Sequence, residues 1–565
     1  MARRSVLALV AASTAIGISV GGAQAATGGA HHRSHPQRTH PRQRRAHDGA
    51  PRSATPIKHL VVIFQENVSF DHYFGTYPNA SNPAGEPRFH AAPGTPTVNG
   101  LSGPLLTHNP NGANPQRLDR SQALTCDQNH GYTAEQKAFD MGLMDSFIPF
   151  TDVESCPPPD TTAPNLVLDY YDGNTVTGLW NYAQHFALSD NSYSTNFGPS
   201  TPGAINVSAG NTFGAICGPA FATINDTPCA GTIGAPTNTA PGASQDQGPG
   251  TMYSDADPYW DVCSGAQQDK HTPDGTIQMG GANIGDLLDR AGATWGWFQG
   301  GFASPGYVSG RPGTDDPSAV CTSAHTNIGG ASQLDYNPHH EPFQYYASTA
   351  NPQHLPPTSV PMIGRQDQAN HQYDLKDFWA AAGHGNLPQV SYLKAPDYED
   401  GHAGYSDPLD EQRFIVSTVN GLERLPSWRD TAVVIAYDDS DGWYDHQMGP
   451  IITQSQSSLD ALSGPGTCGS TVPPDGQQVK CGVGPRQPLL VVSPFAKANF
   501  VDGTFTDQGS VLQFIEDNWL GGERIGAGAA DAQAGTLDNM FTWRARGDRR
   551  LFLDPSTGEP VYGRH

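Results

Sequence analysis

The segment Lys58–Asn67 reads KHLVVIFQEN, and it predicts a buried strand that ends in a carboxylate and a carboxamide. Its first seven residues are rich in β-branched side chains and do not alternate with polar ones, which is typical of a strand covered on both faces. Three further runs share this pattern: QVSYL at 389–393, TAVVIAY at 431–437 and PLLVVS at 488–493. We expect all four to be parallel strands of one sheet.

Segments with helical periodicity lie between these strands. The clearest are residues 134–147, 176–187, 284–291, 411–425 and 510–520. Strands and helices that alternate in this way predict an α/β fold, with a central, mostly parallel sheet and helices on both faces. In such folds ligands bind beyond the carboxyl ends of the strands.

The N-terminus has the pattern of an export signal. Arg3 and Arg4 precede an apolar run, and Ala23-Gln24-Ala25 offers a cleavage site, so residues 1–25 are predicted to be a signal peptide for the Sec or Tat route. Residues 26–56, rich in His, Arg and Pro, are predicted to be a disordered linker, with metal binding as the alternative. Residues 57–565 are then a single catalytic domain of a secreted, periplasmic or cell-surface protein.

Composition and charge limit which kinds of partner this protein can bind. Hydrophobic residues make up 36% of the 565 positions, which is enough for a large core. The net charge of −24 argues against nucleic acid, because an acidic surface repels the phosphate backbone. No stretch beyond the signal peptide is long and apolar enough to predict stable membrane insertion.

Eight cysteines fit an oxidising compartment. In chain order they fall into neighbouring pairs, but the sequence cannot prove connectivity: Cys126/Cys156, Cys217/Cys229, Cys263/Cys321 and Cys468/Cys481. A zinc site is the alternative, although no C-x-x-C spacing supports it. Residues 217–280 and 301–360 are dense in Gly, Pro, Asn, Ser and Thr, and we expect them to be long, disulfide-pinned loop insertions over the active-site face.

Acidic side chains follow two of the predicted strands. Glu66 and Asn67 come directly after the first strand, and Asp438 and Asp439 come directly after the strand at 431–437. Adjacent carboxylates at the end of a buried strand repel each other unless a cation lies between them. Oxygen ligands of this kind suit a divalent metal ion, so the sequence predicts a metal site at this edge of the sheet.

A serine between two prolines is the candidate nucleophile. In FGPSTPGAINVSAG (197–210), Pro199 and Pro202 fix the backbone around Ser200 and would hold its hydroxyl in place. Pro202 excludes the G-x-S-x-G elbow, and Ala204 excludes the sulfatase pattern, in which an arginine stands at that position. A Ser/Pro turn without chemistry is the alternative.

Histidines in polar segments complete the candidate set, because imidazole can donate hydrogen bonds to an anion or protonate a leaving oxygen. They are His130 in CDQNHGY, His339 and His340 in NPHHEPF, and His402 in DYEDGHAGY.

Five motifs occur together in this chain: QENVSFDHYFG, FGPSTPG, YDDSDGWYDH, GPRQPLLVVSPFAK and DQGSVLQFIEDNW. From about Ile57 to about Trp543 the chain therefore resembles the bacterial phosphoesterase family of secreted acid phosphatases and phosphatidylcholine-type phospholipases C, within the alkaline phosphatase-like superfamily. CDQNHGYTAEQKAFDMGLMDSF and NPHHEPF are similar to the acid phosphatase branch. Phospholipase C members usually carry GPT-x-PNR, where this chain has Ser200 and Gly203-Ala204.

The resemblance implies a function and a site. It implies that one divalent ion (calcium, magnesium, manganese, iron or zinc) is bound by Glu66, Asn67, Ser200, Asp438 and Asp439. It also implies that Ser200 attacks phosphorus while His130, His339, His340 and His402 surround the phosphate. The expected activity is hydrolysis of phosphate monoesters through a phosphoserine intermediate.

Two alternatives stay open at this stage. One is a phospholipase C that cleaves phosphatidylcholine-type phosphodiesters, so that the partner is a phospholipid and not a small phosphate ester. The other is a catalytically silent protein that binds a metal or a glycan on the same scaffold.

Overall fold

The computed structural model describes residues 50–157, 164–217, 250–264, 276–303, 309, 320–471, 480–543 and 548–561, all within the compact unit Gly49–His565. The predicted signal peptide and residues 26–49 of the predicted linker lie outside these ranges, so that division of the chain stays a prediction. Within the same ranges, no helix is long and apolar enough to cross a membrane.

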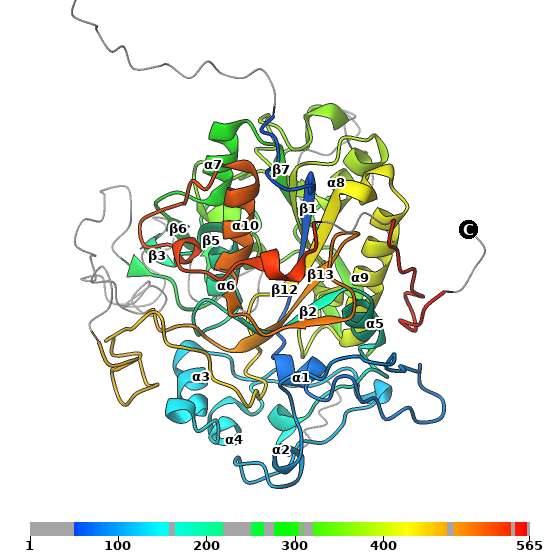
Figure 1. Ribbon diagram of the computed structural model, residues 1–565. Helices are drawn as coiled ribbons and strands as arrows, with labels where there is room; N and C mark the ends of the chain where they lie inside the picture. Colours follow the sequence, from blue (N-terminus) through cyan, green and yellow to red (C-terminus); the bar gives the residue numbers. More distant parts are fainter. Residues whose placement is uncertain are drawn as a thin grey trace, which may run out of the picture. The chain divides into compact units, whose positions relative to one another are not determined.

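A nine-stranded sheet forms the centre of the unit (Figure 1). Its order is β10 (Gln372–Asp374), β7 (Trp295–Gln299), β11 (Val390–Lys394), β1 (His59–Gln65), β12 (Thr431–Tyr437), β13 (Arg486–Val492), β2 (Ala187–Tyr193) and β14 (Phe500–Asp502), and β15 (Thr506–Asp507) also pairs with β2. The strands from β10 to β12 are parallel neighbours, and so are β2, β14 and β15. The predicted α/β class with a mostly parallel sheet is confirmed.

One predicted strand runs in the other direction. The run at 488–493 does form a strand, β13, but β13 is antiparallel to both β12 and β2, so the expectation of a parallel strand there was wrong. The reason is that an uninterrupted apolar run reports burial on both faces and carries no information about direction. All seven residues of β13 are buried, as are those of the parallel strand β12.

Helices cover both faces of the sheet, as the sequence predicts (Figure 1). One side carries α6 (Ser200–Ala209), α7 (Ile284–Ala291) and α10 (Gly509–Trp519), and the other carries α5 (Thr177–His185), α8 (Leu375–Gly383) and α9 (Pro408–Glu423). The predicted helix at 284–291 matches α7, and those at 411–425 and 510–520 match α9 and α10 with small shifts at their ends. The helix predicted at 176–187 ends earlier, because the chain enters β2 at Ala187.

The helix predicted at 134–147 is broken into two. Its residues fall in α3 (Tyr132–Phe139) and at the start of α4 (Phe147–Thr151). Two other short helices, α1 (Phe70–Phe74) and α2 (Pro104–Thr107), precede them in the chain. Asp140, Met141, Gly142 and Met144 between α3 and α4 all have positive φ, which no α-helix accommodates. Hydrophobic periodicity continues through this turn, so the pattern alone overestimates the helix.

The two insertions contain small sheets as well as loops. In the first, β3 (Phe213–Cys217), β4 (Gly250–Thr251), β5 (Asp257–Pro258) and β6 (Thr276–Met279) form a four-stranded sheet, and in the second, β8 (Ala324–Thr326) pairs with β9 (Ser332–Leu334). Three predicted disulfides are confirmed: Cys126–Cys156, Cys263–Cys321 and Cys468–Cys481. The second of these joins the two insertions to each other. The predicted Cys217–Cys229 pair lies outside the described residues.

Candidate active site

Strands β1 and β12 end side by side. They pair in register from His59 opposite Thr431 to Gln65 opposite Tyr437, so the residues that follow leave the sheet at the same level. The Asn67 backbone N–H donates a hydrogen bond to Asp438 Oδ1 at 3.2 Å. Asn67 has φ of 56°, a left-handed conformation that asparagine tolerates better than most residues. The structure thus brings Glu66 and Asn67 together with Asp438 and Asp439.

Ser200 joins this cluster from a third element. Its Oγ lies 2.9 Å from Glu66 Oε2, 3.0 Å from Asp439 Oδ2 and 3.3 Å from Asn67 Oδ1. The sequence suggests a rigid turn here, whereas the structure places Ser200 as the first residue of α6. Pro202 fits because the first turn of a helix needs no N–H donor.

Gly203 lets α6 approach the end of β12 closely. A Cβ atom at position 203 would lie only 2.3 Å from the carbonyl oxygen of Asp438. A side chain there would therefore push the helix that carries Ser200 away from the strand that carries Asp438. Contact between these two backbones fixes Ser200 relative to the carboxylates.

The oxygens at this point fit a divalent metal ion. The Asn67 amide oxygen lies 2.7 Å from Glu66 Oε2, 3.1 Å from Asp438 Oδ1 and 3.2 Å from Asp439 Oδ2, so it faces only acceptors. If the amide is turned over, its NH₂ donates to these carboxylates and its oxygen accepts from His402 Nε2 at 2.8 Å, whereas with the oxygen inward the amide would be a ligand for a cation. Asp438 Oδ2 is buried and, among the described residues, accepts no hydrogen bond.

Electrostatics support the same conclusion. Burial, followed by the neighbouring charge of Asp438, raises the pKa of Asp439 well above its ordinary value. A cation among these oxygens would remove that penalty. A donor set made only of carboxylate, amide and hydroxyl oxygens suits calcium, magnesium or manganese better than softer metals.

A buried lysine that sequence reasoning missed contacts the cluster. Lys394 is the last residue of β11, and its ammonium forms an ion pair with Glu66 Oε1. Burial lowers the pKa of Lys394, although Asp438 and Asp400 act to raise it. The signal in the sequence is a single lysine at the end of an apolar strand.

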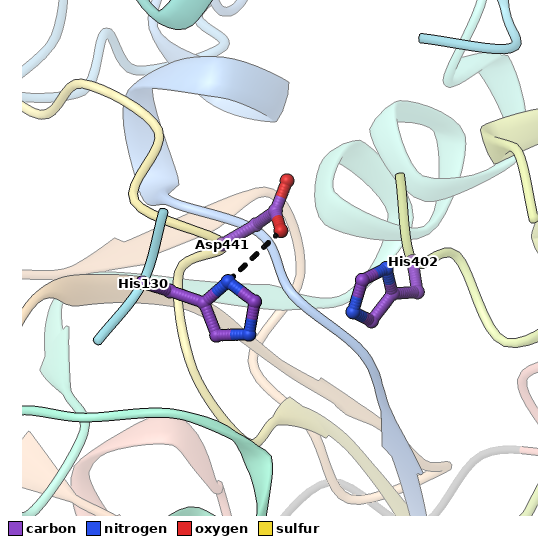
Figure 2. A group of neighbouring side chains, drawn as sticks. All are labelled: His130, His402 and Asp441. Carbon is purple, nitrogen blue, oxygen red and sulfur yellow. Dashed lines mark ion pairs between the residues drawn. The ribbon is translucent and has the colours of Figure 1, made fainter. Parts of the chain in front are cut away.

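His130 and His402 line the same pocket as Ser200, and Figure 2 shows them with Asp441. His130 Nδ1 lies 2.8 Å from the carbonyl oxygen of Gln128 and 3.3 Å from Asp441 Oδ1. Burial lowers the pKa of His130, but the charges of Asp439 and Asp441 outweigh it and raise the pKa well above its ordinary value. The two imidazole centres are 5.7 Å apart.

The structure separates the adjacent pair His339 and His340. Both belong to the short helix Pro338–His340, but only His339 lines the pocket at Ser200. His340 lies behind it, with Nε2 3.5 Å from Glu66 Oε2 and Nδ1 3.4 Å from Asp397 Oδ1. His340 therefore contacts the carboxylate cluster and is not on the pocket wall.

A pocket of about 290 Å³ opens at Ser200. Within the described part of the chain, its wall has no Leu, Ile, Val, Met, Phe or Trp side chain, and three of its members are acidic. It is lined by Asp127, Asn129, His130, Gly131, Glu154, Pro199, Ser200, Ser254, Asp255, Asn337, His339, His402 and Tyr405.

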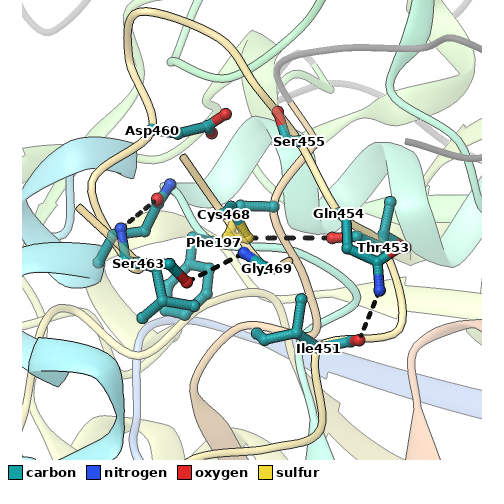
Figure 3. The surroundings of a disulfide bond; sticks show 12 residues. Phe197, Ile451, Thr453, Gln454, Ser455, Asp460, Ser463, Cys468 and Gly469 are labelled. Atoms are coloured by element: carbon teal, nitrogen blue, oxygen red, sulfur yellow. Dashed lines mark hydrogen bonds between the residues drawn. A yellow bond between two sulfur atoms is a disulfide. The ribbon is translucent and has the colours of Figure 1, made fainter. Parts of the chain in front are cut away.

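Two buried contacts hold the residues just before Ser200, Phe197 and Gly198. Glu135 of α3 accepts a hydrogen bond from the Gly198 N–H at 2.9 Å and another from Ser440 Oγ at 2.8 Å, so it ties this segment to the loop after β12. Burial raises the pKa of Glu135 to about 7. On the other side, the Phe197 N–H donates to the carbonyl oxygen of Cys481, whose disulfide with Cys468 packs near Phe197 (Figure 3).

Three of the quoted motifs meet away from the pocket, in a buried ion-pair network. Arg486 is fully buried, with Nη2 3.1 Å from Asp71 Oδ1 and Nε 3.1 Å from Asp445 Oδ2. His446 Nδ1 lies 2.6 Å from Asp71 Oδ2. Because Arg486 pairs with both carboxylates and His446 pairs with Asp71, Asp445 and His446 have a structural explanation.

Several known proteins are similar to this chain in sequence. The model of the Phosphoesterase family matches residues 57–520. A non-hemolytic phospholipase C of Pseudomonas aeruginosa is 22% identical over 483 residues, which cover 82% of this chain and 54% of that protein. A non-hemolytic phospholipase C of Burkholderia pseudomallei is 38% identical over 138 residues, 23% of this chain and 19% of that protein.

The matched regions span about half or less of these relatives' length. A solved structure from Vibrio parahaemolyticus, described as a protein in the alkaline phosphatase superfamily, is 11% identical with a TM-score of 0.25 and covers 59% of each chain. The family match alone extends from β1, which delivers Glu66 and Asn67, to the end of α10. The chain belongs to the Phosphoesterase family.

Proposed function

We propose that this protein hydrolyses phosphate monoesters with Ser200 as the nucleophile and one divalent metal ion held by Glu66, Asn67, Asp438, Asp439 and Ser200. The observation that carries the proposal is the position of Ser200 Oγ, within 3.3 Å of three of the other proposed ligands and at the wall of a polar pocket. When bound, the ion would lower the cost of forming the serine alkoxide.

The side chains of the site supply the remaining steps. Ser200 Oγ loses its proton to water in the pocket and attacks phosphorus in line, while the bond from phosphorus to the leaving oxygen breaks. His130, whose Nδ1 lies 3.3 Å from Asp441 Oδ1, donates to a phosphoryl oxygen. His339 and His402 lie on the same wall, where one of them protonates the leaving oxygen. Water then attacks phosphorus and releases phosphate and the free serine.

The polar wall favours a small monoester over a lipid. Diacylglycerol needs an apolar surface beside the phosphate, and the described wall has no Leu, Ile, Val, Met, Phe or Trp side chain to supply one. Phospholipase C activity remains the second candidate, because the relatives carry that name.

One comparison tests the proposal. We expect kcat/KM for a small chromogenic phosphate monoester to exceed that for phosphatidylcholine in mixed micelles, and Ser200→Ala to abolish both activities while the protein stays folded. Faster turnover of phosphatidylcholine would replace the monoesterase with the phospholipase. Turnover by Ser200→Ala at the wild-type rate would reject the nucleophile.

We also propose that the protein is exported. Three disulfides form within the described residues, and disulfides persist mainly in oxidising compartments. Cell fractionation with an antibody to the protein should find the mature form outside the cytoplasm, and a wholly cytoplasmic protein would contradict export.

A further inference from the structure

We propose that Lys394 limits this site to a single divalent ion, because its ammonium takes the place of a second cation beside Glu66. The inference rests on the proposed metal site, and it concerns how many ions that site accepts.

Glu66 faces two neighbours with its two oxygens. Oε2 lies 2.9 Å from Ser200 Oγ, within the proposed metal cluster, whereas Oε1 forms the ion pair with Lys394. Both side chains are fully buried, so water does not screen the pair. Glu66 therefore stands between two positively charged positions, one for the metal ion and one filled by the ammonium.

A second set of metal-ligating atoms shares Glu66 with the proposed site. Glu66, His340 and Asp400 each offer one ligand atom, and these atoms lie within 4.8 Å of one another. His340 Nδ1 lies 3.4 Å from Asp397 Oδ1, so a further buried carboxylate adjoins this set. Imidazole with carboxylates is a normal ligand set for manganese or zinc.

The number of carboxylates explains why a cation is needed there. Four aspartates are buried together with Glu66, and the charge of each acts to raise the pKa of Lys394. They are Asp397, Asp400, Asp438 and Asp439. One divalent ion at Ser200 does not neutralise all five. Lys394 lies beside Glu66 and supplies a compact positive charge with three donors.

The position of the ammonium is fixed by the fold. Lys394 lies in β11 opposite Gln299 of β7, and its Nζ lies 5.9 Å from the centre of the Phe64 ring. The side chain thus leaves a strand in the middle of the sheet and reaches Glu66 across a buried aromatic residue. Lysine cannot turn away from this place without carrying its charge into the core.

The test counts bound ions. Metal-stripped protein is titrated with Mn²⁺ by calorimetry, and the loaded samples are examined by electron paramagnetic resonance. Wild type should bind one ion with an uncoupled signal. Lys394→Met, which keeps the length of the side chain and removes its charge, should bind two ions whose spins are coupled through the Glu66 carboxylate. The charge-retaining control Lys394→Arg should bind one.

A double variant locates the second ion. Lys394→Met with His340→Gln should return to one ion, because the imidazole ligand is lost. Lys394→Gln is titrated in parallel, so that the count does not depend on the folding of one variant, which near-ultraviolet circular dichroism verifies. Two ions in wild type, or one uncoupled ion in a folded neutral variant, would overturn the inference. Because turnover is not the readout, a protein that binds one ion but hydrolyses no phosphoester would reject the proposed function alone.

Discussion

A single methyl group at position 203 should slow the protein's turnover without altering any polar side chain of the site. In Gly203→Ala the new Cβ would lie 2.3 Å from the Asp438 carbonyl oxygen, 2.7 Å from its carbonyl carbon and 2.9 Å from its Cα. Real Cβ atoms stay at least 3.0 Å from such neighbours, so α6 and the end of β12 must separate by roughly 0.7 Å.

The magnitude follows from that displacement. Misplacing reacting groups by about 1 Å costs on the order of 100-fold in rate, so we expect kcat to fall by about 10- to 100-fold with KM little changed. Overpacking should cost about 1–3 kcal/mol of stability, although alanine is otherwise the better helix former.

Turnover of a chromogenic phosphate monoester and thermal unfolding measure the two effects. The matched control is Gly383→Ala at the end of α8, where a Cβ atom meets nothing within 4 Å, and its kcat should equal that of wild type. A folded Gly203→Ala protein with wild-type kcat would refute the reasoning, because Ser200 and Asp438 would then not depend on this contact.

The other predictions concern two buried ionisable groups of the fold, Arg486 and Glu411. Arg486→Met should lower the free energy of unfolding by about 3–5 kcal/mol in a urea titration, because Asp71 and Asp445 would remain buried without their cation, and Arg486→Lys should cost less. An equal loss in both variants would argue against charge as the cause. Burial raises the pKa of Glu411 to about 8, above the ordinary value of 4.5, so this group makes the stability of the fold decrease as the pH rises from about 4.5 to about 8. Glu411→Gln should therefore gain stability relative to wild type at pH 8 but not at pH 4.5, as measured by thermal unfolding of metal-stripped protein, and a difference independent of pH would contradict that assignment.

The sequence predicts the strands that carry the site because the evidence for them is local. Continuous apolar runs mark β1 and β12, and the acidic residues that follow each run are adjacent in the chain. The direction of β13 could not be predicted, since burial on both faces leaves no trace of strand direction.

Other parts of the site depend on contacts between distant segments. Ser200 begins a helix whose sequence, STPGAINVSA, is a poor helix former, and all ten of its residues are buried, so packing and not propensity determines α6. Lys394 contacts Glu66 from β11, and Glu135 contacts the residue Gly198 before the Ser200 helix from α3. No spacing in the sequence links either residue to Glu66 or Ser200.

The separation of His339 and His340 has the same origin. The backbone turns at Pro338–His340 so that one imidazole meets the pocket and the other meets Glu66. Two adjacent histidines in a polar loop indicate chemistry, but only the surrounding fold decides which one faces a substrate.

Trapping the covalent intermediate tests the central claim most directly. Wild-type protein loaded with metal is mixed with a phosphate monoester, quenched with acid during turnover, digested and analysed by mass spectrometry, with Ser200→Ala as the control. We expect one phosphoryl group on the peptide that contains Ser200 in wild type, and none in the variant. A phosphoryl group on another residue, or its absence from Ser200 while hydrolysis proceeds in rapidly quenched samples, would contradict the assignment of Ser200 as the nucleophile.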